Sequence, residues 1–122
     1  MAWRFVSDRP VYLQIAERIR KAVLAGKYPA GTQIPTVRQL ALEAAVNPNT
    51  VQRAFADLEQ EGIILSKGTV GRYATEDTQV LEACRRRLAG ELVQGFIESM
   101  AQLSISEEQA ISMIKEAQNE LS

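Results

Sequence analysis

The residues whose types and spacing could do chemistry are amide and guanidinium side chains in a segment that begins at Asn47-Pro48. Asn49, Gln52 and Arg53 recur at the spacing that places side chains on one face of a helix. Asn and Gln pair well with the edge of adenine, and Arg pairs with guanine or with phosphate. The acidic residues of this segment all lie in its second half, so the first half can approach DNA. The pattern predicts a helix face that reads bases in the major groove.

Phosphate contacts are predicted on both sides of this face. Thr50 and the backbone N–H groups that follow Asn47 lie at a helix N-terminus, which is a favourable position for a phosphate. Arg38 and Thr36 lie at the start of the preceding segment, from which Arg38 would hold the DNA backbone on the other side. We expect these residues to position the protein on DNA rather than to read its sequence.

A glycine-containing turn supplies a further candidate contact. The β-branched, apolar run at 63–66 and the residues at 72–75 could pair as two strands of a hairpin. Lys67, Gly68 and Arg72 lie in the connection between them. The tip of such a hairpin could lie along phosphates or enter the minor groove.

Each of these predicted contacts has a plainer structural alternative. Asn47 and Thr36 have the residue types of helix N-caps, so capping alone would explain them. Arg53 could instead form a solvated ion pair with Asp57, four residues further along the same helix. The turn at 67–72 could be an ordinary charged surface loop.

Three predicted helices position these side chains. The first runs over residues 10–25, between a proline and a glycine. The second begins after Thr36, three residues before Gln39, which is the spacing of a capping box. The third covers about residues 48–61. Only Ala45-Val46 separates the second helix from the third, and so tight a joint is typical of a helix-turn-helix.

The C-terminal part of the chain is predicted to join two copies of the protein. Residues 79–103 have the apolar periodicity of one long helix, and Ser106 with Gln109 has the capping-box spacing that starts a last helix. The apolar stripe is broader than one small helix pair needs to cover itself. The alternative is that this tail packs on its own N-terminal domain. The residues expected at the contact between copies are Leu88, Leu92, Phe96, Met100, Ile111 and Ile114.

Composition limits what else the chain could do. It contains one cysteine, Cys84, and no histidine, which excludes an intrachain disulfide, a zinc or iron site built on His and Cys, and His-based catalysis. We expect no cofactor, no metal and no enzymatic activity, because no catalytic constellation is arranged. No apolar stretch approaches the roughly 18 residues of a membrane span, and none at the N-terminus has signal-peptide length. A cytoplasmic protein is therefore expected.

Charge divides the chain into two parts. Residues 1–75 carry 10 Lys and Arg against 6 Asp and Glu, a net charge of +4, whereas residues 76–122 carry 4 against 9, a net charge of −5. A basic part joined to an acidic part suggests a domain that faces nucleic acid and a separate module with another role.

Two segments carry a resemblance to a known family. YLQIAERIRKAVLAGKYPAGTQIPTVRQLA and VNPNTVQRAFADLEQEGII agree in length, loop spacing and residue identities with the DNA-binding domain of the GntR family of bacterial regulators, which the chain resembles over residues 10–75. The short tail resembles that of the YtrA-like branch, in which a small pair of helices serves dimerisation. By this resemblance the family's DNA contacts fall on Arg38, Asn47, Pro48, Asn49, Thr50, Gln52, Arg53 and the wing tip around Lys67 and Gly68.

The sequence departs from the family pattern at two places. The tight turn has Ala45 where the family usually has glycine, and residues 69–74 differ from the usual end of the wing. If the turn keeps the family's geometry, Ala45 lies at positive φ, where a Cβ is unfavourable. The alternative is that the second helix runs one residue further and that Ala45 is helical.

These patterns predict a mainly α-helical fold with a small β-hairpin: a winged helix-turn-helix over residues 1–76 and a helical dimerisation tail over residues 77–122. The predicted function is that of a transcriptional repressor, a homodimer that binds near-palindromic operators with the helix at about 48–61 in the major groove. A small-molecule effector is left open. The main rival is a winged-helix module that binds proteins, which would carry acids or exposed apolar residues where this sequence has Asn, Gln and Arg.

Overall fold

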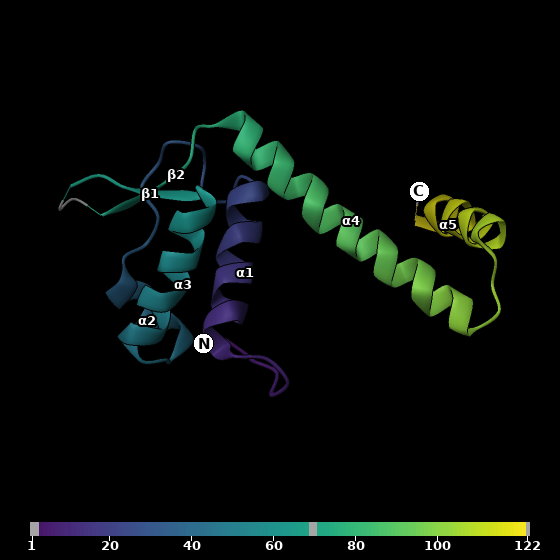
Figure 1. The fold of residues 1–122 in the computed structure, drawn as a ribbon, viewed down its shortest axis with the longest axis horizontal. Helices are drawn as coiled ribbons and strands as arrows, with labels where there is room; N and C mark the ends of the chain where they lie inside the picture. The colour runs from purple at the N-terminus through teal and green to yellow at the C-terminus, as the bar shows by residue number, and fades with distance from the viewer. Residues whose placement is uncertain (1–2, 69–70, 122) are drawn as a thin grey trace. The chain divides into compact units, whose positions relative to one another are not determined.

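The structure is a computed structural model that describes residues 3–68 and 71–121, drawn in Figure 1. By its internal contacts the chain forms two compact units, Met1–Glu82 and Ala83–Ser122. Among the residues described, no helix is long and apolar enough to cross a membrane.

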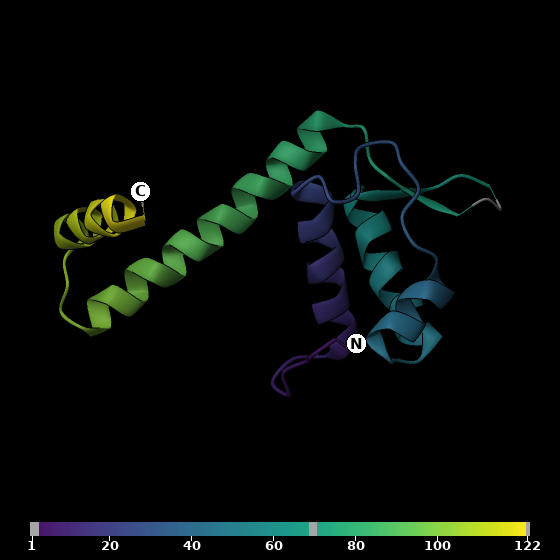
Figure 2. The ribbon, with the colours of Figure 1, turned by 180° about the vertical axis from the view of Figure 1, so that it is seen from behind.

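Two helices form the centre of the first unit. Helix α1 covers Val11–Leu24 and α3 covers Pro48–Glu61, and they lie side by side; Figure 2 shows the same pair from behind. Each buries one face, with Ile15 and Ile19 on α1 and Phe55 on α3 fully shielded from solvent. Burying a side chain of this size contributes about 1.5–3 kcal/mol, so the contact between α1 and α3 makes a substantial contribution to the stability of the unit.

A third helix completes the helix-turn-helix. Helix α2 covers Val37–Ala44 and packs on α3 through its buried face. It starts with the predicted capping box, in which the Thr36 side chain accepts from the Gln39 backbone and the Gln39 side chain accepts from the Thr36 backbone. It ends at Ala45, whose φ of 58° and ψ of 50° are left-handed. The expectation of a positive φ at Ala45 is therefore confirmed, and α2 does not run one residue further.

A hairpin follows α3 directly. Helix α3 ends at Gly62, whose φ of 80° is a conformation that glycine adopts without a Cβ clash. Strands β1 (Ile64–Ser66) and β2 (Arg72–Ala74) then pair antiparallel, with Ser66 opposite Arg72 at the outer end. This hairpin confirms the predicted wing. Thr69 and Val70, which lie between the two strands in the sequence, are outside the described residues.

Of the remaining two helices, α4 begins in the first unit and ends in the second, and α5 belongs to the second. Helix α4 covers Thr78–Gln102 and begins with Asp77, whose carboxylate accepts from the backbone N–H of Gln79 at 3.0 Å. Helix α5 covers Glu107–Leu121 and starts with the predicted capping box of Ser106 and Gln109. A cleft of about 200 Å³ lies where α4 meets α5, and its apolar lining comes from Ile97, Met100, Ala101, Ile105 and Ala110.

Candidate nucleic-acid interface

The outer face of α3 carries the predicted base-reading residues on the surface. Asn49, Gln52 and Arg53 are all exposed, while Val51 and Phe55 of the same helix face the core. Val51 and Phe55 are buried because they lie on the apolar side of the helix, and the polar side therefore faces solvent. The face can therefore meet the edges of bases without any rearrangement of the helix.

Two of the predicted contacts also act as helix caps. The hydroxyl of Thr36 accepts from the backbone N–H of Gln39 at 3.1 Å, and the side-chain oxygen of Asn47 accepts from the backbone N–H of Asn49 at 2.8 Å. The capping alternative is thus realised for both residues. It leaves the hydroxyl proton of Thr36 and the amide protons of Asn47 available to an acceptor.

Arg53 lies on an aromatic ring of another helix. Its guanidinium carbon is 3.9 Å from the ring centroid of Tyr12, in the first turn of α1. No ion pair joins Arg53 to Asp57 within residues 3–68 and 71–121. A guanidinium stacked on a ring keeps its N–H groups free at its edge, so Tyr12 positions Arg53 without consuming its donors.

Arg72 ties the wing to α3. Its Nε donates to the Glu59 carboxylate at 2.8 Å, and its Nη2 donates to the side-chain oxygen of Gln52 at 3.4 Å. Its guanidinium carbon also lies 5.1 Å from the ring centroid of Phe55. Of the wing candidates, Lys67 and Gly68 are exposed, and the ammonium of Lys67 is 4.7 Å from the ring centroid of Tyr73.

Two of the three acids in the second half of α3, Glu59 and Glu61, are held in ion pairs. Glu59 pairs with Arg72, and Glu61 pairs with Arg20 of α1, with both partners of the second pair mostly buried. Each carboxylate therefore has a guanidinium beside it, which reduces its repulsion of phosphate. Arg38, by contrast, is exposed on the first turn of α2, and among the described residues no ion pair involves it.

Sequence reasoning missed the residues that support the predicted contacts. Neither Tyr12 beneath Arg53 nor Glu59 beside Arg72 was singled out. The sequence does indicate that Glu59 lies near Gln52. Phe55 is three residues after Gln52 and Glu59 is four residues after Phe55, and this spacing places all three along one stripe of α3. No such signal existed for Tyr12, because its contact depends on how α1 packs on α3.

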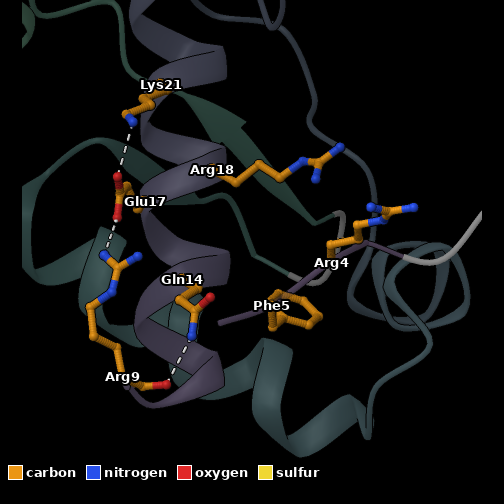
Figure 3. A pocket seen from close by; sticks show the side chains of 7 residues that line it. All are labelled: Arg4, Phe5, Arg9, Gln14, Glu17, Arg18 and Lys21. Carbon is orange, nitrogen blue, oxygen red and sulfur yellow. Dashed lines mark hydrogen bonds and ion pairs between the residues drawn. The ribbon is translucent and has the colours of Figure 1, made fainter. Parts of the chain in front are cut away.

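A second concave surface lies on the solvent side of α1 (Figure 3). Glu17 is central to it: its carboxylate pairs with Lys21 at 2.9 Å and with Arg9 at 3.1 Å, and these contacts hold the pKa of Glu17 below its usual value. Arg4 and Arg18 point to the other side in Figure 3. By helical spacing this surface is opposite the buried face of α1, and thus away from Tyr12 and Arg53. It does not belong to the α3 face.

No cluster of acidic or thiol side chains within residues 3–68 and 71–121 could hold a metal ion. The arrangement instead presents hydrogen-bond donors and acceptors on a rigid helix beside a hairpin. These features define a winged helix-turn-helix of the DNA-binding class.

Comparison with known proteins gives the family. The model of the gntR family of bacterial regulatory proteins matches residues 11–73. The regulator YhcF of Bacillus subtilis is 31% identical over 92% of this chain and 93% of its own length, and the transcriptional repressor YtrA of the same organism is 35% identical over 76% of this chain and 73% of its own. The chain therefore belongs to the gntR family, and the expected likeness to YtrA is confirmed.

Solved structures agree with this assignment. A GntR family transcriptional regulator from Listeria monocytogenes superposes with a TM-score of 0.85 at 38% identity, covering 92% of this chain and 98% of the other. The DNA-binding domain of AraR, solved in complex with operator ORX1, superposes with a TM-score of 0.55 at 26% identity over 62% of this chain and 93% of its own. The protein is a GntR-type DNA-binding transcriptional regulator, not an enzyme.

Proposed function

We propose that the protein represses transcription as a homodimer that binds a near-palindromic operator, with one α3 helix of each copy in the major groove. The observation that carries this proposal is the outer face of α3, which exposes Asn49, Gln52 and Arg53 while Glu59 and Glu61 are held in ion pairs. An exposed face of amides and a guanidinium matches the donor and acceptor pattern of base edges.

The proposed DNA contacts fall into two groups. Asn49, Gln52 and Arg53 read bases. The other contacts position the protein on the phosphates through exposed cations, hydroxyls and the start of α3. This second group comprises Thr36, Arg38, Asn47, Pro48, Thr50, Lys67 and Gly68. In the structure Arg72 is engaged with α3, and a different role for it is developed below.

The proposed dimer contact lies in the tail, residues 77–122, and the proposed DNA-binding domain covers residues 1–76. Within the second unit Leu92, Ile111 and Ile114 are at least half exposed. Several large apolar side chains exposed within one small unit favour a partner surface. A second copy fits best, because two winged helices related by a twofold axis double the contacts with DNA.

The name of YtrA, a transcriptional repressor, supports repression rather than activation as the proposed effect on transcription. Because it binds the bacterial chromosome, the protein would act in the cytoplasm.

The test begins with a selection of binding sites from random duplexes by the full chain. We expect one sequence made of two inverted half-sites, a footprint over both, and reduced transcription from a promoter that contains it. Wild-type protein should bind this duplex at least about 1,000-fold more tightly than a scrambled one. Equal binding to both duplexes would refute sequence-specific recognition, and a single half-site bound by a monomer would refute the dimer.

A further inference from the structure

We propose that Arg72 is a positioning residue that sets the base preference of Gln52: it turns the Gln52 amide so that its N–H donors face the DNA, and the protein prefers guanine over adenine at that base pair. This inference rests on the proposed function, since Gln52 must read a base. It replaces a phosphate contact as the expected role of Arg72.

The first step is the geometry of Arg72. The Nε group donates to Glu59 at 2.8 Å, and Nη2 donates to the side-chain oxygen of Gln52 at 3.4 Å. Gln52, Phe55 and Glu59 lie along one stripe of α3. The side chains of Gln52 and Glu59 converge on the guanidinium, whose carbon lies 5.1 Å from the ring centroid of Phe55. A planar fork with two fixed donors can make both contacts at once, which a lysine cannot do in the same way.

The second step is the cost of releasing Arg72 to a phosphate. The Arg72 side chain is 28% exposed and that of Glu59 is 33% exposed, so the ion pair is partly shielded from water. If Arg72 moved to the DNA backbone, it would leave the Glu59 carboxylate unpaired close to phosphates. Like charges at such a distance repel. The arrangement therefore favours keeping Arg72 on α3 when DNA binds.

The third step is the chemistry of the amide. A glutamine side chain has one acceptor oxygen and one NH2 donor, which point in different directions. The oxygen of Gln52 keeps a second lone pair, but the positive charge of the guanidinium beside it repels the hydrogen of a further donor. The bidentate pairing with adenine requires this oxygen to accept from the adenine amino group, whereas guanine presents two acceptors, N7 and O6, to which the NH2 group can donate. The orientation therefore selects guanine.

The experiment uses the full chain and every single-base variant of the selected operator. Gln52→Ala first identifies the base pair that this residue reads. Arg72→Lys keeps the positive charge of the wing but loses the fork, so we expect the guanine-to-adenine preference at that pair to fall at least about fivefold, with the salt dependence of binding unchanged. In the Gln52→Ala background, Arg72→Lys should not change the preference further.

Two further variants separate positioning from other roles. Glu59→Gln leaves Arg72 in place but weakens its anchor, and it should reduce the same preference in a protein whose thermal midpoint confirms folding. Lys67→Ala removes a charge from the same wing, and it should weaken binding to all duplexes alike and lower the salt slope by about one unit.

The outcomes are distinguishable. If Arg72→Lys leaves the preference unchanged while Gln52→Ala abolishes it, Arg72 does not position Gln52 and only this inference fails. A uniform loss of affinity in Arg72→Ala, with a lower salt slope like that of Lys67→Ala, would make Arg72 a phosphate contact and would also overturn it. If Gln52→Ala changes no base preference, the base-reading role in the proposed function fails together with the inference.

Discussion

The two units of the chain differ in how far they bury their large apolar side chains. In the first unit, Ile15 and Phe55 have no exposed surface, and the contact between α1 and α3 shields both. In the second unit, Leu92 and Leu103 are 71% and 70% exposed. The difference indicates that the first unit buries its hydrophobic core within one chain. The second carries an apolar surface whose burial requires something more, which we propose is a second copy.

The largest effect is expected in the core of the first unit. Phe55→Ala removes a fully buried ring and should lower the free energy of unfolding by about 3–5 kcal/mol. Chemical denaturation at several protein concentrations measures this loss, which should not depend on concentration. Leu42→Ala, at a leucine that is 78% exposed, is the control and should change stability by less than about 0.5 kcal/mol. Equal losses in the two variants would contradict the assignment of the core.

The second prediction tests the exposed surface of the second unit. Leu92→Glu places a charge on the proposed dimer contact, and light scattering should then give a mass near 13.5 kDa instead of twice that value. Operator affinity should fall about 100-fold or more, because the two half-sites would no longer be bound together. Leu42→Glu introduces the same charge at an exposed leucine of the first unit and should leave the mass of the dimer unchanged. A monomeric wild-type protein that binds the operator tightly would refute the role of the tail.

The third prediction concerns Arg38, an exposed cation outside the stripe of base-reading residues. Arg38→Ala should weaken binding to operator and scrambled duplexes alike and flatten the salt slope by about one unit, because one phosphate contact is lost. A salt series on both duplexes measures this. Lys27→Ala removes one positive charge at an exposed site after α1 and should leave the slope unchanged. A selective loss on the operator would instead make Arg38 a base-reading residue.

The smallest effect is expected at the turn between α2 and α3. Ala45 has a φ of 58°, where the Cβ of an L-residue costs about 1–2 kcal/mol. Ala45→Gly removes this cost but adds freedom to the unfolded chain, so we expect a net stabilisation below about 1 kcal/mol and unchanged DNA affinity.

The denaturation midpoint at fixed protein concentration measures the effect of Ala45→Gly. Ala56→Gly, at an exposed alanine inside α3, is the matched control and should destabilise by about 1 kcal/mol. Destabilisation of similar size by both changes would show that Ala45 is not strained.

The sequence by itself determined the helices, their caps, the hairpin and the family. Each of these depends on neighbours within a few residues: Thr36 caps with Gln39, Asn47 caps with Asn49, and Ala45 forms a turn because only three residues separate α2 from α3. The types of residue on the outer face of α3 were visible for the same reason, because helical periodicity alone sorts buried from exposed positions.

Only the tertiary structure decided what the long charged side chains contact. Arg53 lies on Tyr12, 41 positions earlier in the chain, rather than beside Asp57, and Arg72 reaches Glu59 and Gln52 rather than solvent. A flexible side chain can reach several partners of suitable charge, and helical spacing favours none outside its own helix. The choice depends on which surfaces of α1, α3 and the hairpin come together, and the burial of Ile15, Phe55 and Ile64 sets that packing.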